Sequence, residues 1–164
     1  MTDLPVLRLR PKSKPQAIRH GFPWVFADEA VLDRRSRAIP AGGFAVLEDA
    51  ERKPLGLVTV NPNSKIVGRM MDADPQALID GNWLKTRLAR ALQMRERLYD
   101  APFYRLVHAE SDGLPGLVID RFGDAAVIQP NAAWADRMAP QIADALAEVA
   151  GVTTVILNGQ GRAR

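Results

Sequence analysis

Four carboxylates stand close together in the second half of the chain, at Glu110, Asp112, Asp120 and Asp124. Such a group could bind a metal or transfer protons, and a small hydrolase would be built on Glu110, Asp112 and Asp120. Two of the four, however, lie in Asp-Gly and Gly-Asp pairs that are typical of turns, where a carboxylate caps the loop. No metal-ligand spacing joins them, so the sequence favours turn residues and predicts no metal site.

Other catalytic groups are scarce. His20 and His108 are the only histidines, and no serine lies in a nucleophile elbow. The chain has no cysteine, which excludes a thiolate nucleophile and disulfides. The pair Gly159 and Gly161 follows a predicted strand, but no helix follows it to bind a phosphate or cofactor. The sequence therefore predicts no catalytic residue in this chain.

Basic residues are concentrated in the first hundred positions, although the net charge is only +3 and the pI about 9.6. Three clusters there could bind phosphate groups of a nucleic acid. A solvated surface would have the same composition, so both interpretations stay open. The clusters are Arg8, Arg10, Lys12, Lys14 and Arg19; Arg34, Arg35 and Arg37; and Lys85, Arg87, Arg90, Arg95 and Arg97.

Three aromatic residues, Phe22, Trp24 and Phe26, lie between the first two clusters. Aromatic faces can stack on unpaired bases while arginine and lysine take the phosphates. The alternative is that these side chains form the core of a small barrel. For Trp24 the two interpretations are equally supported, and for Phe26 the core is preferred.

Short strands must position these residues in the first half, over residues 1–74. Several strands separated by Gly, Pro and Asn turns favour a small β-barrel over an open sheet. An acidic stretch containing Pro75, over residues 72–80, marks the domain boundary. The predicted strands are Val6–Arg10, Phe44–Glu48, Leu55–Val60 and Lys65–Met71.

The second half, over residues 75–164, alternates helices and strands and predicts a small α/β domain. A helix over 81–99 begins after the N-cap Asp80, and another over 134–149 stops at Gly151. Pro140, inside the pattern of the second helix, either kinks it or marks a later start. The predicted strands are Tyr104–His108, Leu117–Asp120, Ala125–Gln129 and Val152–Leu157. The whole chain is therefore expected to be an α+β protein.

Composition agrees with a folded, water-soluble chain of 164 residues, 47% hydrophobic and 25% charged. No apolar run is long enough to span a membrane, and the first ten residues contain no signal-peptide core. We expect no membrane partner and a cytoplasmic location. The oligomeric state stays open, a homodimer included.

Three stretches carry a resemblance to a known family. Residues 20–26 read HGFPWVF, residues 61–66 read NPNSKI with Arg69 shortly after, and residues 110–124 read ESDGLPGLVIDRFGD. Together they resemble the N-terminal part of the ribosomal RNA large subunit methyltransferase I family. Members methylate C5 of a cytosine in 23S rRNA with S-adenosylmethionine, and carry a PUA domain, a small EEHEE-type α/β domain and a Rossmann-like catalytic domain.

The resemblance implies that this chain binds 23S rRNA and positions it, while S-adenosylmethionine serves the full-length parent and no cofactor is bound here. A catalytic domain would follow Arg164, and a stand-alone PUA-type RNA-binding module is the alternative. The implied RNA-binding residues are Arg8, Arg10, Lys12, Arg19, His20, Trp24 and Arg69. The implied loop at the substrate cleft contains Glu110, Ser111, Asp112, Gly113, Pro115 and Gly116.

Overall fold

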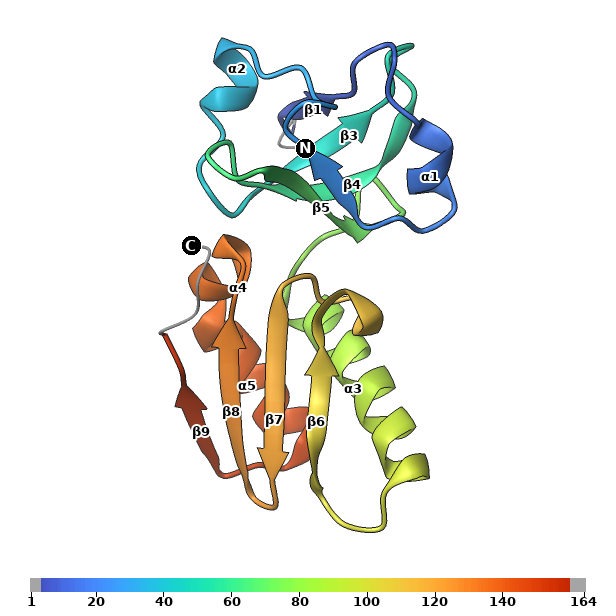
Figure 1. The fold of residues 1–164 in the computed structure, drawn as a ribbon. Coiled ribbons are helices and arrows are strands. Elements are labelled where there is room, and N and C mark those ends of the chain that lie inside the picture. Colours follow the sequence, from blue (N-terminus) through green and yellow to red (C-terminus); the bar gives the residue numbers. More distant parts are fainter. Residues whose placement is uncertain (1–3, 160–164) are drawn as a thin grey trace. The chain divides into compact units, whose positions relative to one another are not determined.

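The computed structural model describes residues 4–159, and the chain divides into two compact units, Met1–Ala77 and Leu78–Arg164 (Figure 1). Gly161, the second glycine of the weak cofactor-loop pattern, lies outside the described residues. In the part of the chain that is described, no helix combines the length and the apolar character needed to cross a bilayer.

A five-stranded sheet forms the first unit, in the order β1-β3-β4-β5-β2. Strand β1 runs parallel to β3, and every other pair is antiparallel. The strands are β1 (Val6–Arg8), β2 (Trp24–Phe26), β3 (Gly43–Glu48), β4 (Pro54–Val60) and β5 (Ile66–Asp72).

The two edges of this sheet come together after β2. The Arg10 amide donates to the Glu29 carbonyl and the Val31 amide to the Arg8 carbonyl, each at 2.8 Å, around a bridge between Leu9 and Ala30. The segment after β2 therefore pairs with the end of β1. The curled, barrel-like sheet predicted from the short strands is confirmed.

Alternation along the strands places one set of side chains inside the curled sheet. Leu7, Val25, Leu47, Val58 and Val67 are fully buried there. Two short helices close the ends of this core. Helix α1 (Pro15–Arg19) begins with a proline that needs no amide partner, and α2 (Arg34–Arg37) is capped by the Asp33 carboxylate.

The second unit is a four-stranded sheet with helices on one face (Figure 1). Its order is β6-β7-β8-β9, antiparallel except for the parallel pair β8 and β9. Helices α3 and α5 pack on each other and on the sheet, burying Leu84, Leu88, Ile142 and Leu146. The elements are α3 (Gly81–Leu98), β6 (Phe103–His108), the 3-10 helix η1 (Ala109–Asp112), β7 (Leu117–Phe122), β8 (Ala125–Pro130), α4 (Ala133–Arg137), α5 (Ala139–Ala150) and β9 (Thr154–Leu157).

The single helix predicted over 134–149 is wrong, because α4 and α5 are separate helices. Met138 lies between them, and Pro140 occupies the first turn of α5, where its missing amide costs no hydrogen bond. The other helix follows its prediction closely. The Asp80 carboxylate accepts from the Trp83 amide at 2.9 Å and starts α3.

Candidate nucleic-acid interface

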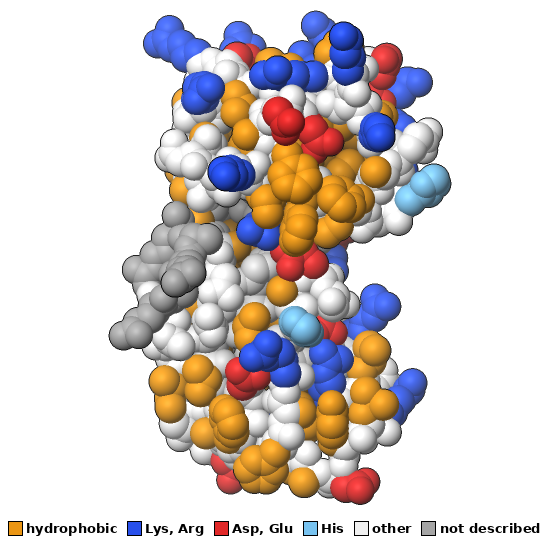
Figure 2. Space-filling model, in the orientation of Figure 1, with side chains coloured by type: hydrophobic (Ala, Val, Ile, Leu, Met, Phe, Trp, Pro, Cys, Tyr) orange, Lys and Arg blue, Asp and Glu red, His pale blue; other side chains and the backbone are white. Residues whose placement is uncertain are grey.

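An aromatic cluster of Phe22, Trp24 and Phe26 lies on the surface of the first unit. The ring centroids are 6.2–6.4 Å apart, with Trp24 edge-on to both phenylalanines. The fully buried residue of β2 is Val25, so its neighbours Trp24 and Phe26 point outward together. Phe22 is 41% exposed and Phe26 36%. Figure 2 shows hydrophobic side chains gathered on this unit.

The prediction that Phe26 belongs to the core is therefore wrong. Strand β2 has three residues at one end of the sheet, and only its central residue faces inward. Three large apolar rings that pack mainly on one another at a surface are costly unless something covers them. This arrangement favours the stacking interpretation that the sequence left open for Trp24.

Strand pairing brings Arg69 to the cluster. Trp24 lies opposite Arg69 in the register between β2 and β5, and the guanidinium carbon is 5.9 Å from the indole centroid. At that distance the cation attracts the ring face and limits its rotation. Two residues far apart in the sequence, both implied in RNA binding by the resemblance, are therefore neighbours.

A hollow of about 120 Å³ opens beside the cluster. Phe22 and Trp24 line it together with Lys14, a cation for which the sequence offered no definite role. Two aromatic rings and an ammonium group on one hollow can receive a base and a neighbouring phosphate. Its other lining residues are Leu9, Ser13, Ala17, Ile18, Val25 and Glu29.

The remaining implied RNA-binding residues surround the barrel differently. Lys12 and His20 are exposed on either side of α1. Arg19, on α1, pairs with Asp49 at 2.9 Å. Arg8 pairs with Glu48 across β1 and β3, and the Arg10 Nε donates to the Ala30 carbonyl at 3.0 Å. Arg8 and Arg10 therefore lie where β1 meets β3 and the segment after β2, and not at the hollow beside the aromatic cluster.

The ion pair of Arg19 rests on a carboxylate that also organises the β3–β4 turn. Asp49 accepts from the amides of Lys53 at 2.9 Å and Glu51 at 3.0 Å. The Lys53 amide, with the Arg19 guanidinium and the Glu51 amide, lowers the pKa of Asp49 below its ordinary 3.8, against the opposing effect of burial. The folded chain therefore prefers this carboxylate ionised.

We expect Asp49→Asn to remove a pH-dependent part of the stability of the first unit. A lowered folded-state pKa stabilises the fold above the unfolded pKa, and that stabilisation is lost as pH falls through the folded pKa. The variant should be less stable than wild type near neutral pH, and the two should converge below about pH 4. Unfolding free energies measured across this range check it. Curves that stay parallel down to acid pH contradict the assignment.

Most cations of the third basic cluster, on α3, have structural partners. Lys85 pairs with Glu148 on α5, and the Arg87 guanidinium lies 4.2 Å from the Trp83 ring centroid. Arg95 pairs with Asp112 at 2.7 Å. These contacts join α3 to the rest of its own unit. The cluster is therefore not a phosphate-binding face as a whole, and its exposed members are Arg90 and Arg97.

The loop over residues 110–116 is tied down by Asp112. Its side chain is 5% exposed, and its Oδ2 accepts from Arg95 and, at 2.6 Å, from the His108 amide. Gly113 follows at φ +70°, as the Asp-Gly turn predicts. Asp112 thus holds the loop, and Ser111 is the member of the loop that is exposed.

The far end of the loop is buried. The Trp134 Nε1 donates to the Pro115 carbonyl at 2.7 Å, and the Asn131 amide donates to the Gly116 carbonyl at 2.7 Å. Trp134 is fully buried, edge-on to Trp83 at 6.3 Å. Pro115 and Gly116 are therefore anchors of the loop, while Glu110 is half-buried at its start.

Gly116→Ala should destabilise the second unit by more than the 1–3 kcal/mol typical of backbone strain. Gly116 has φ +69°, and a Cβ there would lie 2.6 Å from the Ala132 Cβ. Gly123→Ala is the matched control, because Gly123 has φ +62° but its Cβ would meet only the Phe103 ring at 3.7 Å. Unfolding free energies of both variants measure the difference. Equal losses would contradict the close contact.

Residues 4–159 offer no cluster of three or more His, Cys, Asp or Glu side chains that could hold a metal ion. Asp120, one of the carboxylates considered for a hydrolase, instead pairs with Arg105 at 2.9 Å. The same residues contain no glycine-rich turn leading from a strand into a helix, the usual cradle for a nucleotide-like cofactor.

Comparisons with known proteins agree with this geometry. A family model described as a PUA-like domain matches residues 7–73. Ribosomal RNA large subunit methyltransferase I of Cronobacter sakazakii is 35% identical over 138 residues, covering 82% of this chain and 34% of that protein. A ribosomal RNA large subunit methyltransferase of Deinococcus radiodurans is 34% identical over 142 residues, covering 81% of this chain and 34% of its own length.

A solved structure shares the fold. A putative SAM-dependent methyltransferase from Streptococcus mutans matches 94% of this chain and 41% of its own length, with a TM-score of 0.77 and 13% identity. The first unit is thus a PUA-like domain. The chain is similar to members of the ribosomal RNA large subunit methyltransferase I family, as its motifs indicated, and spans about a third of the length of the curated relatives it matches.

Proposed function

We propose that this chain is the RNA-binding and substrate-positioning region of an S-adenosylmethionine-dependent methyltransferase that acts on C5 of a cytosine in 23S rRNA, in the cytoplasm. The convergence of Phe22, Trp24 and Lys14 on one hollow carries the proposal. Aromatic faces take unpaired bases, Lys14, Lys12 and Arg69 supply positive charge, and His20 contributes a ring that can form hydrogen bonds.

The second unit has a different part in this proposal. Its loop over residues 110–116 would form one wall of the substrate cleft, with Ser111 and Glu110 toward the RNA. Asp112, Gly113, Pro115 and Gly116 would fix the shape of the loop, because their contacts are to Arg95, Arg87, Trp134 and Ala132 of the same unit. S-adenosylmethionine and the methyl transfer would belong to the whole protein.

A salt series tests the proposal. A fluorescently labelled fragment of 23S rRNA is titrated with the chain at several KCl concentrations, and binding is followed by anisotropy. Each neutralised phosphate adds roughly 0.7–0.9 to the log–log slope, so several contacts give a slope of about 3 or more. The double variant Lys12→Ala with Lys14→Ala should lower this slope by the amount expected for about two phosphate contacts.

Arg90→Ala with Arg97→Ala is the matched control, since it removes two exposed cations of α3 outside the aromatic surface. This control should keep the wild-type slope. Absence of binding, or a slope near zero, would contradict the proposal. An equal loss in both double variants would show that general charge, and not this surface, determines binding.

A further inference from the structure

The Arg34–Arg37 cluster is not part of the aromatic cluster or of the hollow beside it. It forms α2, which lies at the opposite side of the first unit from α1 (Figure 1). The ion pairs within residues 4–159 involve neither Arg34 nor Arg35. The neighbouring Asp33 carboxylate is already used, because it accepts from the amides of Arg35 and Ser36 and from the Ser36 hydroxyl.

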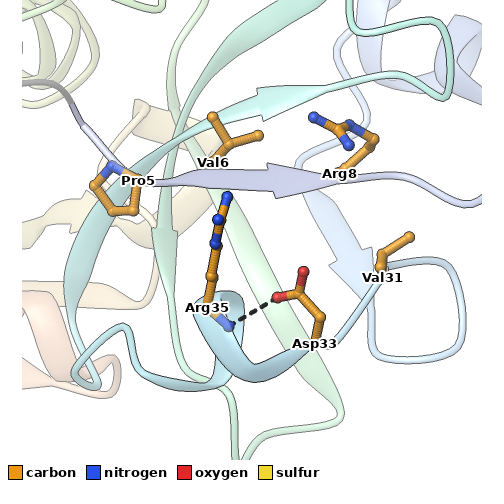
Figure 3. Close-up of a pocket in the computed structure, with 6 residues that line it drawn as sticks. All are labelled: Pro5, Val6, Arg8, Val31, Asp33 and Arg35. Atoms are coloured by element: carbon orange, nitrogen blue, oxygen red, sulfur yellow. Dashed lines mark hydrogen bonds between the residues drawn. The ribbon is translucent and has the colours of Figure 1, made fainter.

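Because Asp33 caps α2, the strand pairing that closes the barrel ends before this helix. Pairing between β1 and the segment after β2 reaches the bond from the Val31 amide to the Arg8 carbonyl. Continued antiparallel pairing would bring Asp33 opposite Val6, but Asp33 caps α2 and the chain turns away from β1. A notch of about 290 Å³ is left, lined by Pro5, Val6, Arg8, Val31, Asp33 and Arg35 (Figure 3).

The backbone of β1 presents a donor to this notch. The Pro5 carbonyl accepts from Val46 and the Leu9 amide donates to Glu48, so these alternate residues face β3. Val6, between them, must direct its amide and carbonyl to the other side, toward the notch. Neither group has a hydrogen bond among the backbone pairs of residues 4–159.

Two guanidinium groups border the same notch. The Arg35 side chain extends from α2 toward Val6 (Figure 3). Arg8 donates to Glu48 through Nε at 3.2 Å and Nη2 at 2.9 Å, which leaves its Nη1 available. Planar guanidinium groups match the paired oxygens of a phosphate, and Arg34 and Arg37 on α2 keep the surroundings positive.

We propose that this notch binds a phosphodiester group of the RNA backbone between Arg8 and Arg35, as an anchor separate from the aromatic hollow. This inference rests on the proposed RNA binding. An added peptide strand fits less well, because the Arg8 carbonyl on this side of β1 is already bonded to the Val31 amide and cannot pair with an added strand. Since phosphates carry no sequence information, this anchor contributes affinity without selectivity.

Arg35→Ala tests the inference against the matched control Arg90→Ala, in the full chain. The probes are the 23S rRNA fragment and an unrelated RNA hairpin of equal length. We expect Arg35→Ala to lower the salt slope by roughly 0.7–0.9 for both RNAs and to weaken both about equally. Arg35→Lys should keep the slope, because the charge remains. Addition of RNA should also shift the Val6 amide signal in ¹H–¹⁵N spectra.

Three outcomes overturn the inference. If Arg35→Ala behaves like Arg90→Ala while Trp24→Ala weakens binding, the notch is not an anchor, although the proposed function stands. If RNA leaves the Val6 signal in place while a synthetic acidic peptide, added in a parallel titration, shifts it, the notch receives protein and not RNA. If the wild-type chain binds neither RNA, the proposed function and the notch inference both fail.

Discussion

Replacing Trp24 with alanine should weaken binding of the chain to the 23S rRNA fragment by roughly 5- to 150-fold. The basis is the value of one base–aromatic stack, about 1–3 kcal/mol. Trp24 lies at the centre of the aromatic cluster, edge-on to Phe22 and Phe26 and near Arg69, so its loss removes the ring and the contact that orients it. Because stacking is neutral, the salt slope should stay near the wild-type value.

The control for this prediction is Phe103→Ala, which removes an aromatic ring that is 65% exposed in the second unit. It should leave RNA binding unchanged. Trp24 is half-buried, so its truncation also removes packing, and Phe22→Ala provides a second test at a more exposed ring of the same hollow. Wild-type affinity in both cluster variants, with thermal unfolding confirming that they are folded, would refute stacking at this site.

Asp112→Ala should destabilise the second unit by about 3 kcal/mol, as expected when one partner of a largely buried ion pair is removed. For a unit of this size, that loss corresponds to a fall in Tm of roughly 12–24 °C. The reason is that the Nη2 of Arg95, whose side chain is 13% exposed, and the His108 amide would both lose their acceptor. Ser111→Ala, one position earlier and exposed, should leave Tm within about 2 °C, as surface substitutions usually do.

Tryptophan fluorescence can follow this unit alone. In a Trp24→Phe background the remaining tryptophans are Trp83 and Trp134, both in the second unit. Their fluorescence should show a loss of stability of the second unit in Asp112→Ala and no such loss in Ser111→Ala. A catalytic carboxylate behaves differently, since its replacement leaves or raises stability. An Asp112→Ala chain as stable as wild type would therefore contradict its structural role and reopen the acid–base interpretation.

Much of the fold follows from local sequence patterns. Short apolar runs between turn residues predicted β3, β4, β5 and β8 to within about a residue or two at each end, because these strands carry buried side chains and turn chemistry is local. Asp80 and Gly151 marked helix ends, since capping chemistry is local. One helix was predicted over 134–149 because an apolar stripe of helical period continues across Met138, and Pro140 indicated a kink or a later start without distinguishing the two.

The candidate site was harder to predict, because its contacts join distant residues. The aromatic type of Trp24 suggested nucleic-acid binding and the family resemblance implied Arg69, but their adjacency depends on the register of β2 with β5. Phe26 was misassigned because its aromatic type is equally common in cores and at interfaces. The structural roles of Arg87 and Arg95 on α3 were not predicted, because the sequence alone does not show which side chains they contact. The notch beside α2 exists only because Asp33 caps a helix.

Ultraviolet crosslinking of the wild-type chain to the 23S rRNA fragment tests whether the aromatic cluster contacts RNA bases. The crosslinked peptides are identified by mass spectrometry. If the aromatic hollow holds unpaired bases, the crosslinks should fall on Phe22, between α1 and β2, and on Trp24, the first residue of β2. Crosslinks confined to the second unit, with the aromatic cluster unmodified, would contradict the account.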